Sequence, residues 1–423
     1  MSNLVRETVR SNLKKRYQAE KRFRLYGVAS VSFGLLCLVF LFGDIVYKGA
    51  GAFRQTVVEA ELYFDPEVLD LDVPFETGQL RSANYDGVIR LMLREQFPEV
   101  TTRSDRRALY SLISVDATYD LQAMAMANPD LIGQSRKIWL LADDDVDMYY
   151  KYGREGEQVG RLGESARGWV EQLIEHGAVK TRFNTGFFTN GDSRNPESAG
   201  VKGAVLGSLF TLLVTFLISF PVGVAAAIYM EEFAPKNKIT DFIEVNINNL
   251  AAVPSIIFGL LGLAVFINFF GVPRSVPLVG GLVLSLMTLP TVIISSRASI
   301  TAVPPSIREA ALGIGASKVQ VVLHHVLPLA LPGMLTGAII GMARALGETA
   351  PLLMIGMIAF IIDPPSSVLD PSTALPVQIY LWADSPERAF TERTSAAIMV
   401  LLAFLIVMNS LAVWLRRRLE TRW

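Results

Sequence analysis

The stretch PPSIREAALGIGASKVQVVLHHVLP, residues 304–328, decides the fold, because it places two short helices and a glycine turn between long apolar runs. Pro305 and Ser306 are typical of a helix start, and Gly315 permits the turn that ends this helix. Ser317 is placed to cap the second helix. The first helix is expected to be amphipathic, and its apolar face would carry Ile307, Ala310, Ala311 and Ile314.

Long apolar runs on both sides of this stretch predict an α-helical polytopic membrane protein. Of the 423 residues, 51% are hydrophobic and only 19% are charged, and the mean hydropathy is +0.37. Soluble domains carry about 25% charged residues. Each run is long enough to cross a hydrocarbon core of about 30 Å. The six predicted crossings are residues 25–43, 204–230, 246–273, 275–296, 328–362 and 394–415.

Two of these crossings have special features. Only Arg274 separates the third crossing from the fourth, so these two are expected to form a tight hairpin. Pro328 is expected to open the fifth crossing, which is too long for one straight helix, and Pro351 is expected to kink or break it.

The distribution of basic residues predicts the orientation. Residues 1–24 are strongly basic, and the last crossing is followed by three consecutive arginines, Arg416 to Arg418. Both termini are therefore expected in the cytoplasm, and residues 298–327 with them. A cleaved signal peptide is the alternative for the N-terminus. Its apolar core would be about 7–15 residues long, shorter than the run here, so a retained anchor over residues 1–47 is favoured.

Residues 48–203 are expected to form a soluble domain, mixed α/β or α, outside the cytoplasm. Helical periodicity is present at 84–97 and 167–176, and 136–142 is a candidate strand. The acidic run from Asp143 to Asp147 has the composition of a calcium site but no EF-hand spacing, so a solvated turn is favoured.

The composition argues against several classes of function. With a net charge of −1 there is no electrostatic case for nucleic acid binding. A single cysteine, Cys37, forms no disulfide within the chain, and the histidines have no zinc-site spacing. No phosphate-binding GxxxxGK[ST] loop and no catalytic motif is present, so neither ATP hydrolysis nor another enzymatic activity is expected of this chain.

Charged residues inside predicted crossings are the candidates for a substrate path. Arg344 and Glu348 are spaced i, i+4 and are expected to share a helix face. A charge in the membrane centre costs at least about 2.5–3.5 kcal/mol, so such residues usually face a pathway or pin helices together. An arginine fits an oxyanion, since its donors match phosphate geometry. Arg297, after the fourth crossing, is either a second path residue or a flanking cytoplasmic charge.

The stretch at 304–328 resembles the EAA loop of ABC importer permeases, EAA-x3-G-x9-I-x-L-P. His325 stands where the family pattern prefers isoleucine, and a neighbouring residue is expected to supply the apolar contact. In that family the loop holds the coupling helix, which inserts into an ATPase subunit. The resemblance therefore implies ATPase coupling by Glu309, Ala310, Ala311, Gly315, Leu327 and Pro328.

The run RALGETAPLL, residues 344–353, resembles the PstA family of phosphate permeases. Sulfate and molybdate permeases tend to have Gly-Glu-Phe-Gly here, and PstC-type permeases continue differently after Gly-Glu-Thr. PstA-like chains also have an arginine near Arg297 that is implicated in phosphate passage. The resemblance covers 204–423, and a subset of the family carries an extension similar to 48–203.

This resemblance implies a permease core at 204–423 with its coupling loop at 298–327. The expected partners are a PstC-like permease, a PstB-like ATPase dimer, a PstS-like phosphate-binding protein and membrane lipid. ATP and magnesium would be bound by the ATPase, and no cofactor or metal by this chain. The rival interpretations are a permease for sulfate or molybdate, and a membrane-anchored sensor that acts through residues 48–203.

Overall fold

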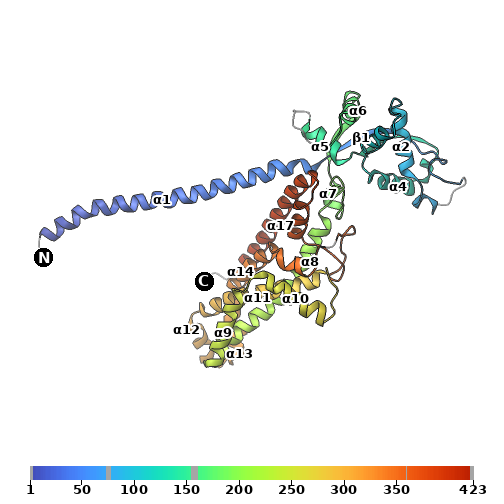
Figure 1. Cartoon of the computed structure of the whole chain (residues 1–423). Helices are drawn as coiled ribbons and strands as arrows, with labels where there is room; N and C mark the ends of the chain where they lie inside the picture. The colour runs from blue at the N-terminus through green and yellow to red at the C-terminus, as the bar shows by residue number, and fades with distance from the viewer. Residues whose placement is uncertain (1–2, 73–77, 154–160, 359, 420–423) are drawn as a thin grey trace.

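The computed structural model describes residues 3–72, 78–153, 161–358 and 360–419. The predicted N-terminal anchor starts at residue 1 and the predicted permease core ends at residue 423, and both of these positions lie outside the described residues. It consists of a long N-terminal helix, a small α/β domain and a helical bundle (Figure 1). The N-terminal helix α1, Asn3–Gly49, extends away from the bundle and contacts it near its C-terminal end, where it packs on α17. This contact is close, because a Cβ on Gly49 would lie 2.8 Å from the backbone nitrogen of Ala396.

The bundle contains the membrane-spanning helices. In the described part of the chain, five helices are long and apolar enough to cross a membrane, or six spans if one sharply bent pair counts as one. The predicted class, an α-helical polytopic membrane protein with a mixed α/β domain after its first helix, is confirmed. The helices of the bundle are α8 Lys202–Ile228, α9 Lys238–Ala251, α10 Ser255–Gly262, α11 Pro277–Thr301, α12 Pro305–Gly313, α13 Lys318–Val321, α14 Leu327–Leu346, α15 Ala350–Met354, α16 Leu375–Ala383 and α17 Ala389–Leu419.

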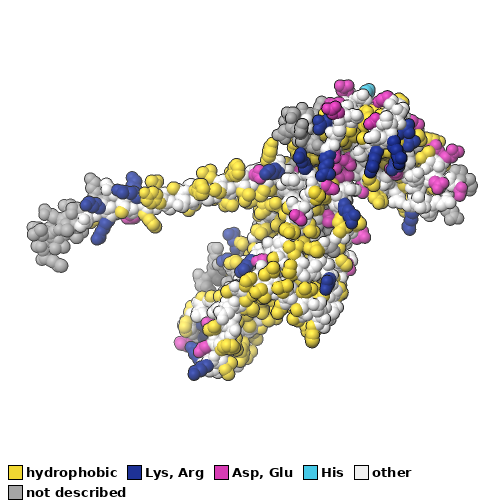
Figure 2. All heavy atoms as spheres, in the orientation of Figure 1, with side chains coloured by type: hydrophobic (Ala, Val, Ile, Leu, Met, Phe, Trp, Pro, Cys, Tyr) yellow, Lys and Arg dark blue, Asp and Glu magenta, His cyan; other side chains and the backbone are white. Residues whose placement is uncertain are grey.

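The chemical character of the surface matches this assignment. In Figure 2 hydrophobic side chains cover the side of the bundle and the part of α1 nearest to it. Charged side chains gather on the α/β domain, on the far part of α1 and at the end of the bundle that carries α9, α12 and α13. An apolar band between two charged ends is the pattern of a protein that spans a bilayer.

The predicted third crossing, residues 246–273, is not one straight helix. It is divided into α9 and α10, which meet at an angle of 100°, and α10 continues as the π-helix η6, Leu263–Phe269. Pro254 lies in the break, and its ψ of 135° is extended. A proline disfavours helical geometry in the residue before it and supplies no N–H for a helical hydrogen bond, so the helix does not continue through this position. The predicted crossing is therefore a sharply bent pair of helices rather than one continuous helix.

The predicted fifth crossing, residues 328–362, also differs. Its helix begins earlier, since the second loop helix continues without a break from Lys318 to Leu346 and Pro328 lies inside it. The break comes at 347–349, before Pro351 rather than at it, and Pro351 stands at the start of α15. A proline in the first turn of a helix loses no hydrogen bond, so Pro351 initiates a helix rather than breaking one.

Small residues bring α14 against α11. A Cβ on Gly337 would lie 1.7 Å from Ser295 Oγ, and a Cβ on Gly333 would lie 2.3 Å from Ser299 Oγ. Glycines on one helix and serines on the other permit this close approach of two backbones, which is a common way to associate helices in lipid. The packing fixes the depth at which every side chain of α14 lies.

The inserted domain, whose strands and helices run from Arg54 to Thr189, has a three-stranded antiparallel sheet of order β2-β1-β3. Val58 pairs with Leu140 on one side and Val179 on the other, and these residues belong to the core of the domain. The predicted helices and strand at 84–97, 167–176 and 136–142 are confirmed as α2, α6 and β2. The elements are β1 Arg54–Tyr63, α2 Tyr85–Gln96, α3 Arg103–Tyr110, α4 Ala117–Ala127, β2 Ser135–Leu141, α5 Asp144–Tyr152, α6 Glu164–Glu175, β3 Val179–Phe183 and α7 Gly186–Thr189.

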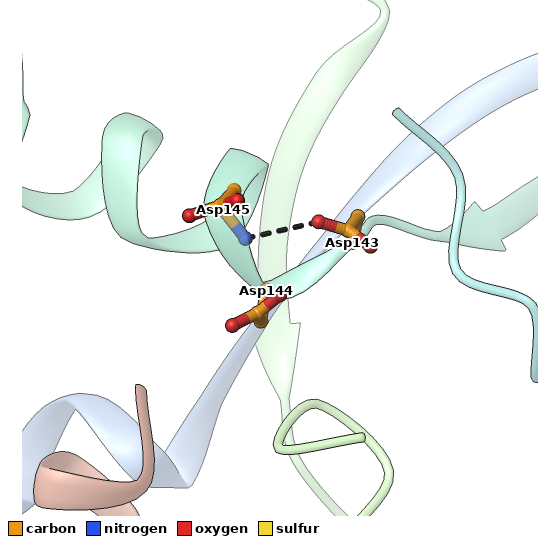
Figure 3. A group of neighbouring side chains, drawn as sticks. All are labelled: Asp143, Asp144 and Asp145. Carbon is orange, nitrogen blue, oxygen red and sulfur yellow. Dashed lines mark hydrogen bonds between the residues drawn. The ribbon is translucent and has the colours of Figure 1, made fainter. Parts of the chain in front are cut away.

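The acidic run begins α5 and is not the expected solvated turn. Asp143 is the N-cap of α5, and its side chain accepts a hydrogen bond of 3.2 Å from the backbone N–H of Asp145 (Figure 3). Carboxylate oxygens of Asp143, Asp144 and Asp145 lie within 4.8 Å of one another, and all three residues are half-buried. As the N-cap, Asp143 satisfies a backbone N–H that the first turn of α5 leaves without a helical partner, which accounts for its position.

A buried network of charges fastens the inserted domain to α17. Lys151 of α5 lies 2.6 Å from Asp147 and 3.4 Å from Glu392, and it donates hydrogen bonds to the carbonyls of Gly51 and Arg54. Glu392 also accepts a hydrogen bond of 3.1 Å from the Tyr152 hydroxyl.

Arg393 occupies the centre of this junction. It is 2% exposed and donates to the backbone carbonyls of Ala52, at 2.8 Å, and Glu197, at 3.4 Å. Its guanidinium also lies 5.9 Å from the ring centre of Phe187. Arg393 therefore joins three parts of the chain: the segment between α1 and β1, the segment that leads to α8, and the start of α17.

Removal of Arg393 is expected to destabilise this junction strongly. Arg393→Met would leave the buried carbonyls of Ala52 and Glu197 without their charged donor, and each such loss costs about 1.5–3 kcal/mol. The measurement is the thermal unfolding midpoint of the purified protein in detergent. Arg103→Met, at an exposed position of α3, is the control, and equal shifts for the two variants would contradict the assigned role.

The stability of the inserted domain is expected to fall as the pH rises from 5 to 8. Burial raises the pKa of the Glu197 carboxyl to about 7 and that of Asp143 to about 8. The folded state therefore holds protons that the unfolded chain releases near its ordinary pKa, so stability is greatest below that pKa and is lost as the pH passes through about 7 to 8. Unfolding curves at several pH values test this, and Glu197→Gln should flatten the dependence.

Candidate coupling site and substrate path

The helix predicted from Pro305 onward, to which the resemblance assigns coupling, forms as α12. It begins at Pro305, and the turn that ends it has Gly315 at φ +90°. Ser317 then caps the next helix in a capping box, in which its hydroxyl accepts from the Gln320 N–H and its own N–H donates to Gln320 Oε1 at 2.8 Å. The loop is therefore a rigid helix–turn–helix at the end of the bundle.

Only part of the predicted apolar face of α12 is buried. Ala311 is 4% exposed and packs in a core that includes Val326 and Ile300, with Ile307 partly buried beside it. Ala310 and Ile314 are exposed, so the predicted apolar face is divided between the core of the bundle and the outer surface. They lie on the outer surface with Glu309, Leu312 and Gly313.

The departure from the family pattern at His325 is explained by its neighbour. His325 is exposed, whereas Val326 is 1% exposed and packs in the core beneath α12. Leu327 is partly buried against the same core, and Pro328 is exposed. The expectation that an adjacent residue supplies the apolar contact is confirmed.

The outer surface of α12 combines a carboxylate with exposed apolar groups. Leu312 is 48% exposed and Ile314 is 85% exposed, beside the small residue Ala310 and the carboxylate of Glu309. Large apolar side chains rimmed by polar groups are typical of a surface that docks into another protein.

Arg344 and Glu348 come together at the break in the fifth span. Arg344 lies in the last turn of α14, whereas Glu348 lies beyond the end of the helix, so the two do not share a helix face as predicted. Their closest nitrogen and oxygen are nevertheless 3.7 Å apart. The Arg344 side chain is 56% exposed and that of Glu348 is 20% exposed, so the guanidinium has donors free for another ligand.

Arg297 lies in a different place from this pair. The Gly341 backbone is level with Thr288 of α11, since a Cβ on Gly341 would lie 3.7 Å from the Thr288 Cβ. Arg344 lies beyond this level and Arg297 lies on the opposite side of it. At roughly 1.5 Å per residue, the two arginines are about 18 Å apart along the bundle. They do not form one site in this conformation.

Two carboxylates hold the Arg297 guanidinium. Its Nε lies 2.6 Å from Glu231 of η5, the π-helical turn Tyr229–Phe233 that continues α8, and an Nη lies 3.0 Å from Glu244 of α9. These residues line an open hollow of about 530 Å³ with Asn248. Sequence reasoning missed these acidic partners, although the Glu231-Glu232 pair ends the second apolar run and is visible in the sequence.

Several membrane-spanning helices, one of them broken, with a short helix that exposes apolar groups at one end of the bundle, define the class of an integral membrane transport subunit. The chain belongs to the family described as binding-protein-dependent transport system inner membrane component, whose family model matches residues 219–422. Residues 10–158 match a second model, described only as a domain of unknown function, DUF3333.

Curated relatives agree with this membership. A probable ABC transporter permease of Bacillus subtilis, YqgI, is 34% identical over 44% of this chain, and the match spans 62% of its own length. The phosphate transport system permease PstC of Haemophilus influenzae is 31% identical over 53% of this chain and 77% of its own. The phosphate transport system permease PstA 2 of Mycobacterium bovis is 30% identical over 54% and 75%.

The turn at Gly315 is expected to be essential for coupling. Gly315→Ala would place a side chain in a backbone conformation that disfavours it, at about 1–3 kcal/mol, although the surrounding space is open. The amount of ATPase subunit that co-purifies should fall about fivefold or more. Gly168→Ala, on α6 of the inserted domain and also in open space without positive φ, is the control and should leave it unchanged.

Proposed function

We propose that this chain is the transmembrane permease subunit of an ATP-driven importer of inorganic phosphate. The observation that carries the proposal is the exposed guanidinium of Arg344 at a break in a membrane-spanning helix, within the phosphate-permease-like run RALGETAPLL. Relatives named as phosphate transport permeases support the substrate.

The geometry suits transient binding of an oxyanion. Arg344 offers a planar set of donors that matches phosphate oxygens, and the attraction is stronger in a site with little water. Glu348, 3.7 Å away, competes for the same guanidinium. A carboxylate at this distance keeps the arginine oriented while phosphate is absent and limits how tightly phosphate is held, so that the anion is released.

The proposed assembly follows from the coupling helix. Glu309, Ala310 and the exposed side of α12 would dock on a PstB-like ATPase dimer, which binds ATP and magnesium. A PstC-like permease would complete the path and a PstS-like binding protein would deliver phosphate. The basic ends of α1 and α17 favour an orientation in the bacterial inner membrane with both termini in the cytoplasm.

Transport would proceed by alternating access. Closure of the ATPase dimer moves α12, and the movement passes to the spans so that the region of Arg344 opens to one side and then the other. The role of Arg297 in the path stays a prediction, because in this conformation its guanidinium is occupied by Glu231 and Glu244.

Uptake of radiolabelled phosphate tests the proposal in cells that lack the gene and carry plasmid-borne variants. The wild-type chain should restore high-affinity uptake that sulfate and molybdate do not inhibit. Arg344→Ala should lower it by about 10- to 100-fold, the loss expected for hydrogen bonds to a charged group. Arg274→Ala, exposed in a loop, is the control. Unchanged phosphate uptake without the gene would show that the substrate is wrong.

A further inference from the structure

Two adjacent carboxylates at the end of α8 are each bound by an arginine from a different helix. Glu231 and Glu232 both lie in the π-helical turn η5. Glu231 pairs with Arg297 of α11, and Glu232 pairs with Arg308 of α12. The wider turn of a π-helix changes the direction of successive side chains, and such turns are frequent at functional sites.

Arg308 uses all three guanidinium nitrogens in this arrangement. Its Nε and one Nη donate to the same carboxylate oxygen of Glu232, at 3.1 and 3.0 Å. The Nη atoms also donate to the backbone carbonyls of Val303, at 2.6 Å, and Ile300, at 2.8 Å, near the end of α11. The pair is mostly shielded from solvent, with side-chain exposures of 23% for Arg308 and 16% for Glu232.

Adjacent residues of α12 therefore serve opposite surfaces. Arg308 reaches inward to the bundle, whereas Glu309 is exposed on the outer surface with Ala310. Apolar packing of α12 on the bundle is slight, since Ala311 is its one fully buried residue. A short helix between a Pro-Pro segment and a glycine turn needs a further attachment if it is to pass on a force.

We infer that Arg308 is the positioning residue that clamps the coupling helix α12 to α8 and α11, so that these helices move with it as one body. A push on α12 reaches the end of α8 through Glu232 and the end of α11 through the two carbonyls. Arg297 extends the same connection from α11 to α9 through Glu231 and Glu244.

This inference rests on the proposed function only for the identity of the subunit that pushes. The clamp itself is independent of the transported anion. It concerns coupling, and not substrate binding, because Arg308 lies at the end of the bundle that carries α12.

The distance between α12 and the end of η5, measured by spin labels, tests the clamp. Labels are placed at Ser306→Cys and Lys236→Cys, both exposed, in a background with Cys37→Ser, in the complex as purified from membranes. In the otherwise unchanged chain we expect a narrow distance distribution that is the same without nucleotide and with ATP, magnesium and vanadate. In Arg308→Gln the distribution should broaden, and nucleotide should shift it by about 2 Å or more.

Two further variants separate coupling from simple misfolding. Glu232→Gln removes the ion pair but leaves the carbonyls of α11 capped by Arg308, so it should give a smaller shift of the same kind. Lys318→Gln removes an exposed positive charge from the next helix and should change nothing.

The outcomes are distinct. If Arg308→Gln behaves like the unchanged chain, or if nucleotide already moves α12 relative to η5 in the unchanged chain, the clamp is refuted. If no ATPase accompanies the chain, the proposed function fails, while the width of the nucleotide-free distribution still decides whether Arg308 holds α12.

Discussion

The close contact of α14 with α11 is the constraint on which the rest of the bundle depends. Glycines at positions 333 and 337 face serines of α11, and no larger side chain fits between these backbones. Lipid supplies no hydrophobic drive for helices to associate, so close packing of small residues has to supply the attraction. It also sets the position of Arg344 along the bundle, and it brings the C-terminal end of α11 to the loop that carries α12, where Arg308 reaches the carbonyls of Ile300 and Val303.

Much of the architecture could be predicted from local sequence. The charge-free runs give the spans, and Gly315 and Ser317 give the turn and cap of the coupling loop, because these features depend on composition and near neighbours. A break in the fifth crossing was predicted, but its position at 347–349 was not, and the bend at Pro254 was missed. Whether a helix continues in lipid depends on which neighbours satisfy the freed backbone groups, and one sequence does not show those neighbours.

The charged residues of the candidate sites likewise divide into those that the sequence predicts and those that only the structure reveals. The i, i+4 spacing of Arg344 and Glu348 predicts that they lie close together. They are 3.7 Å apart, although the helix ends between them. The carboxylate partners of Arg308 and Arg297 lie more than 50 residues away in sequence, and a single sequence carries no signal that pairs such distant charges. Likewise Lys151 and Glu392 meet across 241 positions, a contact that only the folded chain reveals.

The buried junction has a consequence for how separable the parts of this chain are. The inserted domain has the position of a separable module between α1 and α8, but Glu392 and Arg393 of α17 find their partners in that domain and its connecting segments. Gly51 is part of the same fit, because a Cβ there would lie 1.6 Å from a Glu392 oxygen. A shortened chain would keep two orphaned charges at the edge of the bilayer. Gain or loss of this domain in a lineage therefore requires accompanying change in the last spanning helix.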